Sequence, residues 1–257
     1  MNVKQWIEHF TRNRNAFSEP DWWQLGQDGG SLQDDPRRKL LVRSLATFQL
    51  GESGGGSRLL RFVRRETGEG SEYDSAMRLF IAEEQYHAEL LAHLVRYLGG
   101  KLLEKHWMNA VFRSARNLFH LEFNVQVLLT AELIAEAYYG FLHRHVNDDP
   151  IRKVCGKILA DEVRHIAFHS EFFRQRNRNK LPASAALWSI QFQAIFIATE
   201  RAVWIDHGRW LLAFGVSRQK FSETARNCCR RFLESVLLPP SRHTSPFADL
   251  PPTTEQV

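Results

Sequence analysis

Apolar residues recur at intervals of three and four positions along most of the chain, and no segment alternates apolar and polar residues over a useful strand length. Spacing of this kind is typical of helices that bury one face. The sequence therefore predicts an all-α protein, with helices over residues 36–65, 72–98, 107–146, 150–177, 183–213 and 217–238.

Local signals mark several of these boundaries. The pairs Asp35-Pro36 and Asp149-Pro150 suit the cap and first turn of a helix. Gly99-Gly100 is a usual helix stop. The run Gly54 to Gly56 lies inside the first predicted helix, where each glycine costs about 1 kcal/mol relative to Ala. We interpret this run as a kink or distortion, with a break in the helix as the alternative.

The helices define three segments. Residues 1–34 are predicted to form an N-terminal cap with a short helix. Residues 35–238 form the main domain, and residues 239–257 form a Pro-, Ser- and Thr-rich tail that we expect to be disordered or draped over the surface. Five aromatic residues are expected to pack the cap onto the domain: Trp6, Phe10, Phe17, Trp22 and Trp23.

One pattern of polar residues occurs twice in the main domain. Glu52 is followed, after 31 intervening residues, by the Glu84-Gln85-Tyr86-His87 run. Glu132 is followed, after 29, by the Glu162-Val163-Arg164-His165 run. Each half is thus a lone Glu and then a Glu-x-x-His. A single Glu-x-x-His is weak evidence, but a second copy at nearly the same distance from a lone Glu is much harder to obtain by chance.

The spacing has a chemical meaning. Residues three apart on a helix lie on one face, so each Glu-x-x-His offers an oxygen and a nitrogen to one metal ion. Four carboxylates and two imidazoles inside a four-helix bundle form the ligand set of a carboxylate-bridged di-iron or di-manganese site. The predicted ligands are Glu52, Glu84, His87, Glu132, Glu162 and His165.

Other residues are expected to support this set. Glu136 lies one turn after Glu132 and is a possible extra ligand, or else an ion-pair partner of a neighbouring residue. A metal-bound His usually donates its other N–H to a carboxylate. We therefore expect Asp161 to orient His87 and Glu83 to orient His165, while Arg164 neutralises the acids and His169 supports the site. The flanking tyrosines are Tyr86, Tyr138 and Tyr139, and an apolar substrate pocket is expected near Phe48, Phe80, Tyr86 and Phe168.

On these residues the chain resembles the ferritin-like di-iron carboxylate superfamily, over roughly residues 36–177. The run from Asp161 to His165 is similar to the D-E-x-R-H signature of di-iron oxygenases, which include arylamine N-oxygenases and the aerobic cyclase of chlorophyll synthesis. The resemblance implies a ferritin-like four-helix bundle with the six ligands named above. Ile158 stands where some arylamine N-oxygenases carry an additional His, and the predicted helices 183–213 and 217–238 exceed a minimal ferritin or rubrerythrin bundle.

Composition narrows the alternatives. The chain has 257 residues, a net charge of +5 and three cysteines, none in a C-x-x-C pair, which argues against a rubredoxin-type iron centre. No uninterrupted apolar stretch predicts a membrane span, and a reducing cytoplasm is the simplest location. Two groups of basic residues are expected to be solvated faces or a docking surface for an acidic partner: Arg58, Arg61 and Arg65, and Arg174, Arg176, Arg178 and Lys180. Nucleic acid is not expected, because no aromatic-basic motif accompanies them.

The sequence thus predicts a non-haem di-iron oxygenase or oxidase that uses O₂ to hydroxylate, N-oxygenate or desaturate a small organic substrate, free or carrier-linked. Two iron ions are expected, with Mn/Fe or two Mn as alternatives, and a ferredoxin or reductase would supply electrons. The helix over 183–213 could form a homodimer face. Other functions left open are a ferritin-like ferroxidase, a rubrerythrin-like peroxide scavenger and a non-enzymatic helical binding module.

Overall fold

A computed structural model describes residues 1–16, 30–115 and 120–237 of the chain. These residues form helices and connecting turns, with no strand among them. The prediction of an all-α protein is confirmed.

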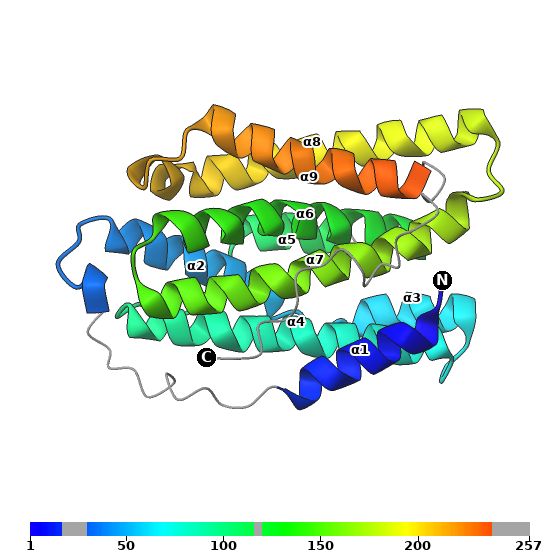
Figure 1. The fold of residues 1–257 in the computed structure, drawn as a ribbon, viewed down its shortest axis with the longest axis horizontal. Helices are drawn as coiled ribbons and strands as arrows, with labels where there is room; N and C mark the ends of the chain where they lie inside the picture. Colours follow the sequence, from blue (N-terminus) through cyan, green and yellow to red (C-terminus); the bar gives the residue numbers. More distant parts are fainter. Residues whose placement is uncertain (17–29, 116–119, 238–257) are drawn as a thin grey trace.

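Four helices run side by side through the middle of the molecule: α2 (Arg38–Glu52), α4 (Glu72–Tyr97), α6 (Leu121–His145) and α7 (Asp149–Asn177) (Figure 1). The closest associations are between α6 and α7 and between α2 and α4, and α4 also contacts α7. The pair formed by α2 and α4 therefore faces the pair formed by α6 and α7.

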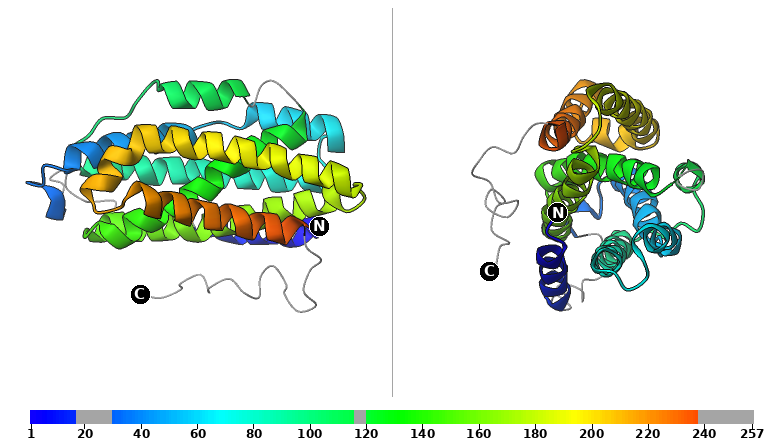
Figure 2. Two further views of the ribbon diagram at one scale, coloured as in Figure 1. Left: turned by 90° about the horizontal axis from the view of Figure 1, so that it is seen from above. Right: turned by 90° about the vertical axis from the view of Figure 1, so that its right-hand side faces the viewer.

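Further helices surround these four. Helix α1 (Val3–Asn15) packs against α4, while α8 (Pro182–Ala213) and α9 (Arg218–Leu237) form a separate layer over α6 and α7 (Figure 2). Helix α5 (Trp107–Ala115) lies on another side and contacts α2 and α6. A 3₁₀ turn, η2 (Gly30–Leu32), precedes α2.

The first predicted helix, 36–65, is wrong as a continuous element. Helix α2 ends at Glu52, and α3 (Ser57–Thr67) begins after Gly56, so the alternative of a break is confirmed. Gly56 has φ +58°, a left-handed conformation that interrupts a right-handed helix and that glycine adopts at little cost. A Cβ atom at Gly56 would also lie 2.4 Å from Ile81. The glycine run thus lets α3 leave the axis of α2 directly after Glu52.

The predicted helix 107–146 is likewise not continuous. Helix α5 ends at Ala115 and α6 begins at Leu121, after His120 in an extended conformation with ψ 176°. A helix cannot pass through such a residue. Helix α5 is a separate helix that contacts α2 and α6, and no local signal in the sequence predicts this arrangement.

The remaining boundaries agree with the sequence to within a few residues. Ser71 caps α4 by accepting the Asp74 N–H, and Gly99 with φ +71° follows its end. The cap of α7 is Asp148, which accepts the Ile151 N–H, one residue earlier than the Asp149-Pro150 start suggested. The expected helix start at Asp35-Pro36 shifts to Arg38.

The N-terminal cap is anchored by its aromatic residues. Trp6 and Phe10 of α1 are buried and contact Phe168 of α7 with ring centroids 5.5 and 5.4 Å apart. The predicted packing of Phe17, Trp22 and Trp23 and the predicted tail 239–257 lie outside the described residues.

Among the described helices, α6 is the one whose length and apolarity would suffice to cross a membrane. Of its apolar window, 83% is buried inside the protein, and the core helix of a soluble protein passes the same test.

The basic residues at the end of α7 are mostly paired within the molecule. Arg176 forms an ion pair with Glu66, Lys180 lies 2.7 Å from Glu122, and Arg174 donates to the Ser235 carbonyl. The other basic group, Arg58, Arg61 and Arg65, is exposed on α3.

Candidate metal centre

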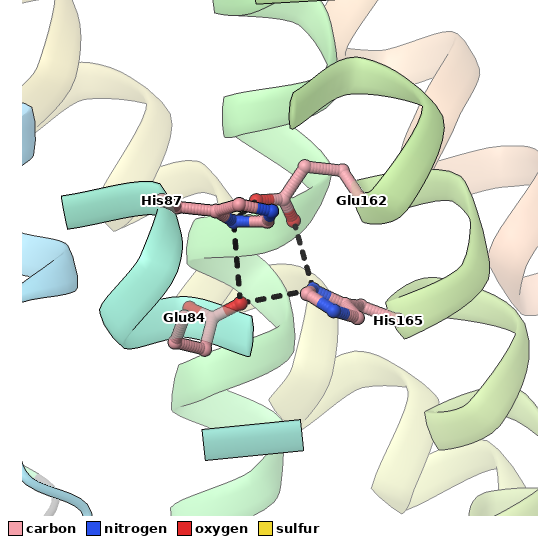
Figure 3. Close-up of side chains that lie close together, drawn as sticks. All are labelled: Glu84, His87, Glu162 and His165. Carbon is pink, nitrogen blue, oxygen red and sulfur yellow. Dashed lines mark ion pairs between the residues drawn. The ribbon is translucent and has the colours of Figure 1, made fainter. Parts of the chain in front are cut away.

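Two helices bring both Glu-x-x-His motifs to one point. Glu84 and His87 lie on α4, Glu162 and His165 lie on α7, and one ligand atom from each lies within 4.8 Å of the others (Figure 3). In each motif the three-residue spacing places both side chains on the same helix face. Because α4 and α7 contact each other, the two faces meet inside the protein.

Within the cluster, imidazole nitrogens face carboxylate oxygens. His165 Nδ1 lies 2.9 Å from Glu84 Oε1 and 3.7 Å from Glu162 Oε2. His87 Nδ1 lies 3.6 Å from Glu162 Oε1 and 3.8 Å from Glu84 Oε1. Each His is thus placed between the Glu of its own motif and the Glu of the other, a nearly twofold arrangement.

The other nitrogen of each ring is held by a further carboxylate. His87 Nε2 is 3.0 Å from Asp161 Oδ2, and His165 Nε2 is 3.0 Å from Glu83 Oε2. These are the two pairings that the sequence led us to expect. They hold both rings with Nδ1 directed into the cluster. The carboxylate partner of a metal-bound imidazole holds the ring in the same way.

Two residues that sequence reasoning missed support these carboxylates. Asn13 of α1 donates to Glu83 and, over 3.1 Å, to Asp161 Oδ1, so it joins the two outer acids. Lys157 forms an ion pair with Asp161 from one turn earlier on α7. The four-residue spacing of Lys157 and Asp161 is a signal that could have been used. No local pattern points to Asn13, which reaches the site only because α1 packs against α4.

The two lone glutamates lie beside the cluster. Glu52 and Glu132 line the same cavity of about 140 Å³ as Glu84 and Glu162. Tyr139 donates to Glu52 Oε1 over 3.1 Å, and His169 Nε2 lies 3.4 Å from Glu132 Oε1. All four predicted carboxylates therefore face one space, and His169 adjoins Glu132.

Mutual electrostatics dominate the site. Burial alone would lower the pKa of His87, but Asp161 and Glu162 raise it to about 9. Burial would also lower the pKa of His165, but Glu162, Glu83 and Glu84 raise it well above the ordinary value. Burial would raise the pKa of Glu84, whereas His165 and His87 lower it to about 2. Metal-free, these residues therefore form a cluster of cationic imidazoles around an anionic carboxylate.

The lone glutamates shift in the opposite direction. Burial and the charges of Glu84 and Glu162 raise the pKa of Glu52 well above its ordinary value. Burial also raises the pKa of Glu132, against the opposing effect of His169. Both carboxylates are therefore poised to hold a proton unless a cation compensates for burial.

Several oxygen and nitrogen atoms that could bind a metal ion form no hydrogen bond among the described residues, although ion-pair contacts join some of them. They are Glu84 Oε1, His87 Nδ1, both carboxylate oxygens of Glu132, Glu162 Oε2 and His165 Nδ1. Buried polar atoms are nearly always satisfied, because an unpaired one costs about 1–3 kcal/mol. A group of such atoms converging on one point is what a metal site without its ion presents. The oxygen-rich donor set with two imidazoles fits iron or manganese.

Glu136 does not join this group. It lies outside the cavity and forms an ion pair with Arg231 of α9. Its position therefore agrees with the alternative expectation, that of an ion-pair partner. Arg164 is half-buried; burial lowers its pKa, and the charge of Asp161 opposes that change.

The aromatic residues expected around the site are divided. Phe48 and Phe80 line the cavity, while Tyr86 and Phe168 do not. Phe48 stacks on Tyr138 with ring centroids 3.7 Å apart, and the Tyr138 hydroxyl bonds to Ser44 over 2.7 Å.

No family model, no curated protein and no solved structure matches this chain. The assignment of a function therefore depends on the geometry of the cluster itself.

Proposed function

We propose that this protein is a non-haem di-metal oxygenase or oxidase, in which α2, α4, α6 and α7 form a ferritin-like bundle around two iron ions. The proposed ligands are Glu52, Glu84, His87, Glu132, Glu162 and His165. Manganese suits the same ligands, so Mn/Fe and Mn₂ centres belong to the same proposal.

A single observation carries the proposal: the cluster directs oxygen and nitrogen atoms inward while its imidazoles are held from outside. One ligand atom each of Glu84, His87, Glu162 and His165 lies within 4.8 Å of the others, and Asp161 and Glu83 hold the rings. A further carboxylate behind each imidazole is the usual arrangement around a metal-bound His. This favours a metal centre over the alternative of a non-enzymatic helical module.

A pair of iron ions bound here would supply the redox chemistry that activates O₂ and oxidises an organic molecule. The chain's own residues have definable tasks around it. Asp161 and Glu83 orient the imidazoles, and Asn13 and Lys157 hold those acids. Tyr139 holds Glu52 through its hydroxyl proton.

The cavity favours oxidation of a substrate over iron storage. It opens beside the four carboxylates, and most of the side chains that line it are apolar. A ferroxidase needs an iron path rather than an apolar chamber, and a rubrerythrin-like function would need a C-x-x-C electron centre that the sequence lacks.

The proposal implies partners. An external electron donor, such as a ferredoxin or reductase, must reduce the metals, since the sequence shows no flavin or nicotinamide motif. We place the protein in the cytoplasm, in keeping with three free and buried cysteines.

The test is metal content per chain after anaerobic loading with Fe(II), followed by optical spectra on exposure to O₂. We expect two irons per chain and a transient visible absorption band. The variants Glu84→Ala and Glu162→Ala should lose iron. The control Glu136→Ala, which removes only the ion pair with Arg231, should keep two irons per chain. Circular dichroism should show each variant to be helical.

Two results would contradict the proposal. A folded chain that binds no stoichiometric metal would leave a structural bundle, and uptake far beyond two irons per chain would indicate storage.

A further inference from the structure

The cavity beside the cluster has an unusual wall. Its metal-facing side consists of Glu52, Glu84, Glu132 and Glu162, and its other sides are mostly apolar side chains from α2 to α6 and from α8. Among the described residues that line it there is no Lys, Arg or His. Without a bound metal ion, these side chains therefore offer no cation to a negatively charged ligand.

Few polar groups are available in the apolar part. The hydroxyl of Thr47 donates to the Arg43 carbonyl over 3.1 Å, and that of Thr199 donates to the Ile195 carbonyl over 3.0 Å. Both donors are thus used within their own helices. Among the described lining residues, Asn109 of α5 is the one with a side-chain amide. A ligand here would be recognised mainly by shape and apolar contact.

The size of the cavity limits the ligand. Its volume is about 140 Å³. An engineered apolar cavity of about 150 Å³ is known to stay dry and bind benzene. This space therefore matches one six-membered ring or a short branched hydrocarbon, and not a long acyl chain.

The entrance is built from glycines. Gly51 and Gly54 line the cavity and are both exposed, so the space reaches solvent where α2 gives way to the glycine run. Gly51 lies within α2, where Ala would be favoured by about 1 kcal/mol. A Cβ atom at Gly51 would meet nothing within 4 Å. Neither steric crowding nor helix stability explains why residue 51 is a glycine. A glycine at this position does, however, keep the passage into the cavity open.

We propose that this cavity is the substrate site and that it admits a neutral, compact, largely apolar molecule of about one ring through the opening at Gly51 and Gly54. The oxidisable end of the molecule lies against the four carboxylates, and its remainder lies among Phe48, Phe80 and Phe112. The acidic wall of the metal-free cavity repels carboxylates and phosphates, and the cavity is too small to hold a long acyl chain. As an assignment of substrate class, this inference rests on the proposed function.

The experiment uses toluene as the probe with the full-length chain, metal-free and loaded with redox-inert Zn(II), and measures binding by calorimetry. We expect saturable toluene binding at one site in both forms. The metal-free chain should bind benzoate, which has the same ring and a negative charge, at least tenfold more weakly. 1-Methylnaphthalene, with two rings, should also bind at least tenfold more weakly.

Three variants locate the site. Gly51→Leu should weaken toluene binding at least tenfold, because its side chain extends across the opening. Ala135→Leu should do the same by filling the interior. Gly55→Leu is the matched control: Gly55 belongs to the same run, has nothing within 4 Å of a Cβ and does not line the cavity, so binding should change less than twofold.

The possible failures are distinguishable. Absence of toluene binding, or binding that neither Gly51→Leu nor Ala135→Leu weakens, would overturn the pocket even if two irons bind. Toluene binding with the expected pattern in a chain that holds no stoichiometric metal would support the pocket and contradict the proposed function. Equal binding of benzoate and toluene by the metal-free chain would overturn the exclusion of anions.

Discussion

At the scale of single residues, each candidate imidazole ligand lies between carboxylates on both sides. His87 has Asp161 on Nε2 and Glu162 near Nδ1, and His165 has Glu83 on Nε2 and Glu84 near Nδ1. A ring held at Nε2 needs no reorganisation to present Nδ1 to a cation, so the outer acids should contribute directly to metal affinity.

Asp161→Asn tests this role. The substitution keeps the size of the side chain but removes the charge that orients His87, so the affinity for Fe(II) or Mn(II) should fall about 10- to 100-fold. Competition with a chelator of known affinity measures the change.

Glu136→Gln is the control, because Glu136 lies outside the cluster and should leave the affinity unchanged. If Asp161→Asn binds metal as tightly as the unmodified chain, then Asp161 does not act through His87.

At the scale of the elements, the connection between α2 and α3 decides the shape of the site. Glu52 is the last residue of α2, and the glycine run that follows turns the chain away while leaving Gly51 and Gly54 at the cavity. A straight helix over residues 36–65 would carry α3 along the axis of α2 and place side chains where the opening now lies.

Two neighbouring glycines of this turn, Gly55 and Gly56, should respond differently to substitution by Ala. Gly56→Ala introduces a left-handed non-glycine residue and a Cβ atom 2.4 Å from Ile81, and should destabilise the protein by about 2–4 kcal/mol. Gly55→Ala meets nothing within 4 Å and should change stability by about 0.5 kcal/mol or less. Urea denaturation monitored by circular dichroism measures both; equal effects would show that the turn is not constrained at Gly56.

At the scale of the whole molecule, a buried polar network ties the outer layer to the bundle. His207 of α8 approaches Ser44 of α2 with 2.6 Å between Nδ1 and Oγ, and Ser44 bonds Tyr138 of α6 over 2.7 Å. Burial lowers the pKa of His207 to about 4. The joint between the layers therefore contains a group that must stay neutral.

This network predicts a loss of stability in acid. In the unfolded chain His207 takes up a proton near pH 6.5, whereas the folded protein resists doing so until about pH 4. Between these values the unfolded state binds more protons, so stability is complete above pH 6.5 and falls as the pH is lowered. The full shift corresponds to about 3 kcal/mol.

Urea denaturation from pH 7 to pH 4 provides the measurement. The unmodified chain should lose about 3 kcal/mol more than His207→Gln over this range, while a substitution at the exposed His120 should leave the slope unchanged. Parallel curves for the unmodified chain and His207→Gln would show that His207 does not control this loss.

The helical class and the central cluster were predictable from the sequence because their signals are local. Apolar periodicity indicates helices regardless of what they pack against. The spacing in Glu84-x-x-His87 and Glu162-x-x-His165 places each pair on one helix face, and a four-helix bundle brings such faces together. The pairing of Asp161 with His87 and of Glu83 with His165 was also expected, because a metal-bound His usually donates its other N–H to a carboxylate.

What the tertiary structure decided concerns contacts between elements distant in the chain. Asn13 reaches Glu83 and Asp161 only because α1 packs on α4, and Glu136 belongs to Arg231 only because α9 covers α6. From the sequence, the glycine run was compatible with either a kink or a break in the helix. The structure shows a break, at which Gly56 lies so close to Ile81 that a side chain would not fit. Periodicity and spacing act along one helix, whereas the opening at Gly51, the cavity and the supporting residues depend on how separate helices pack.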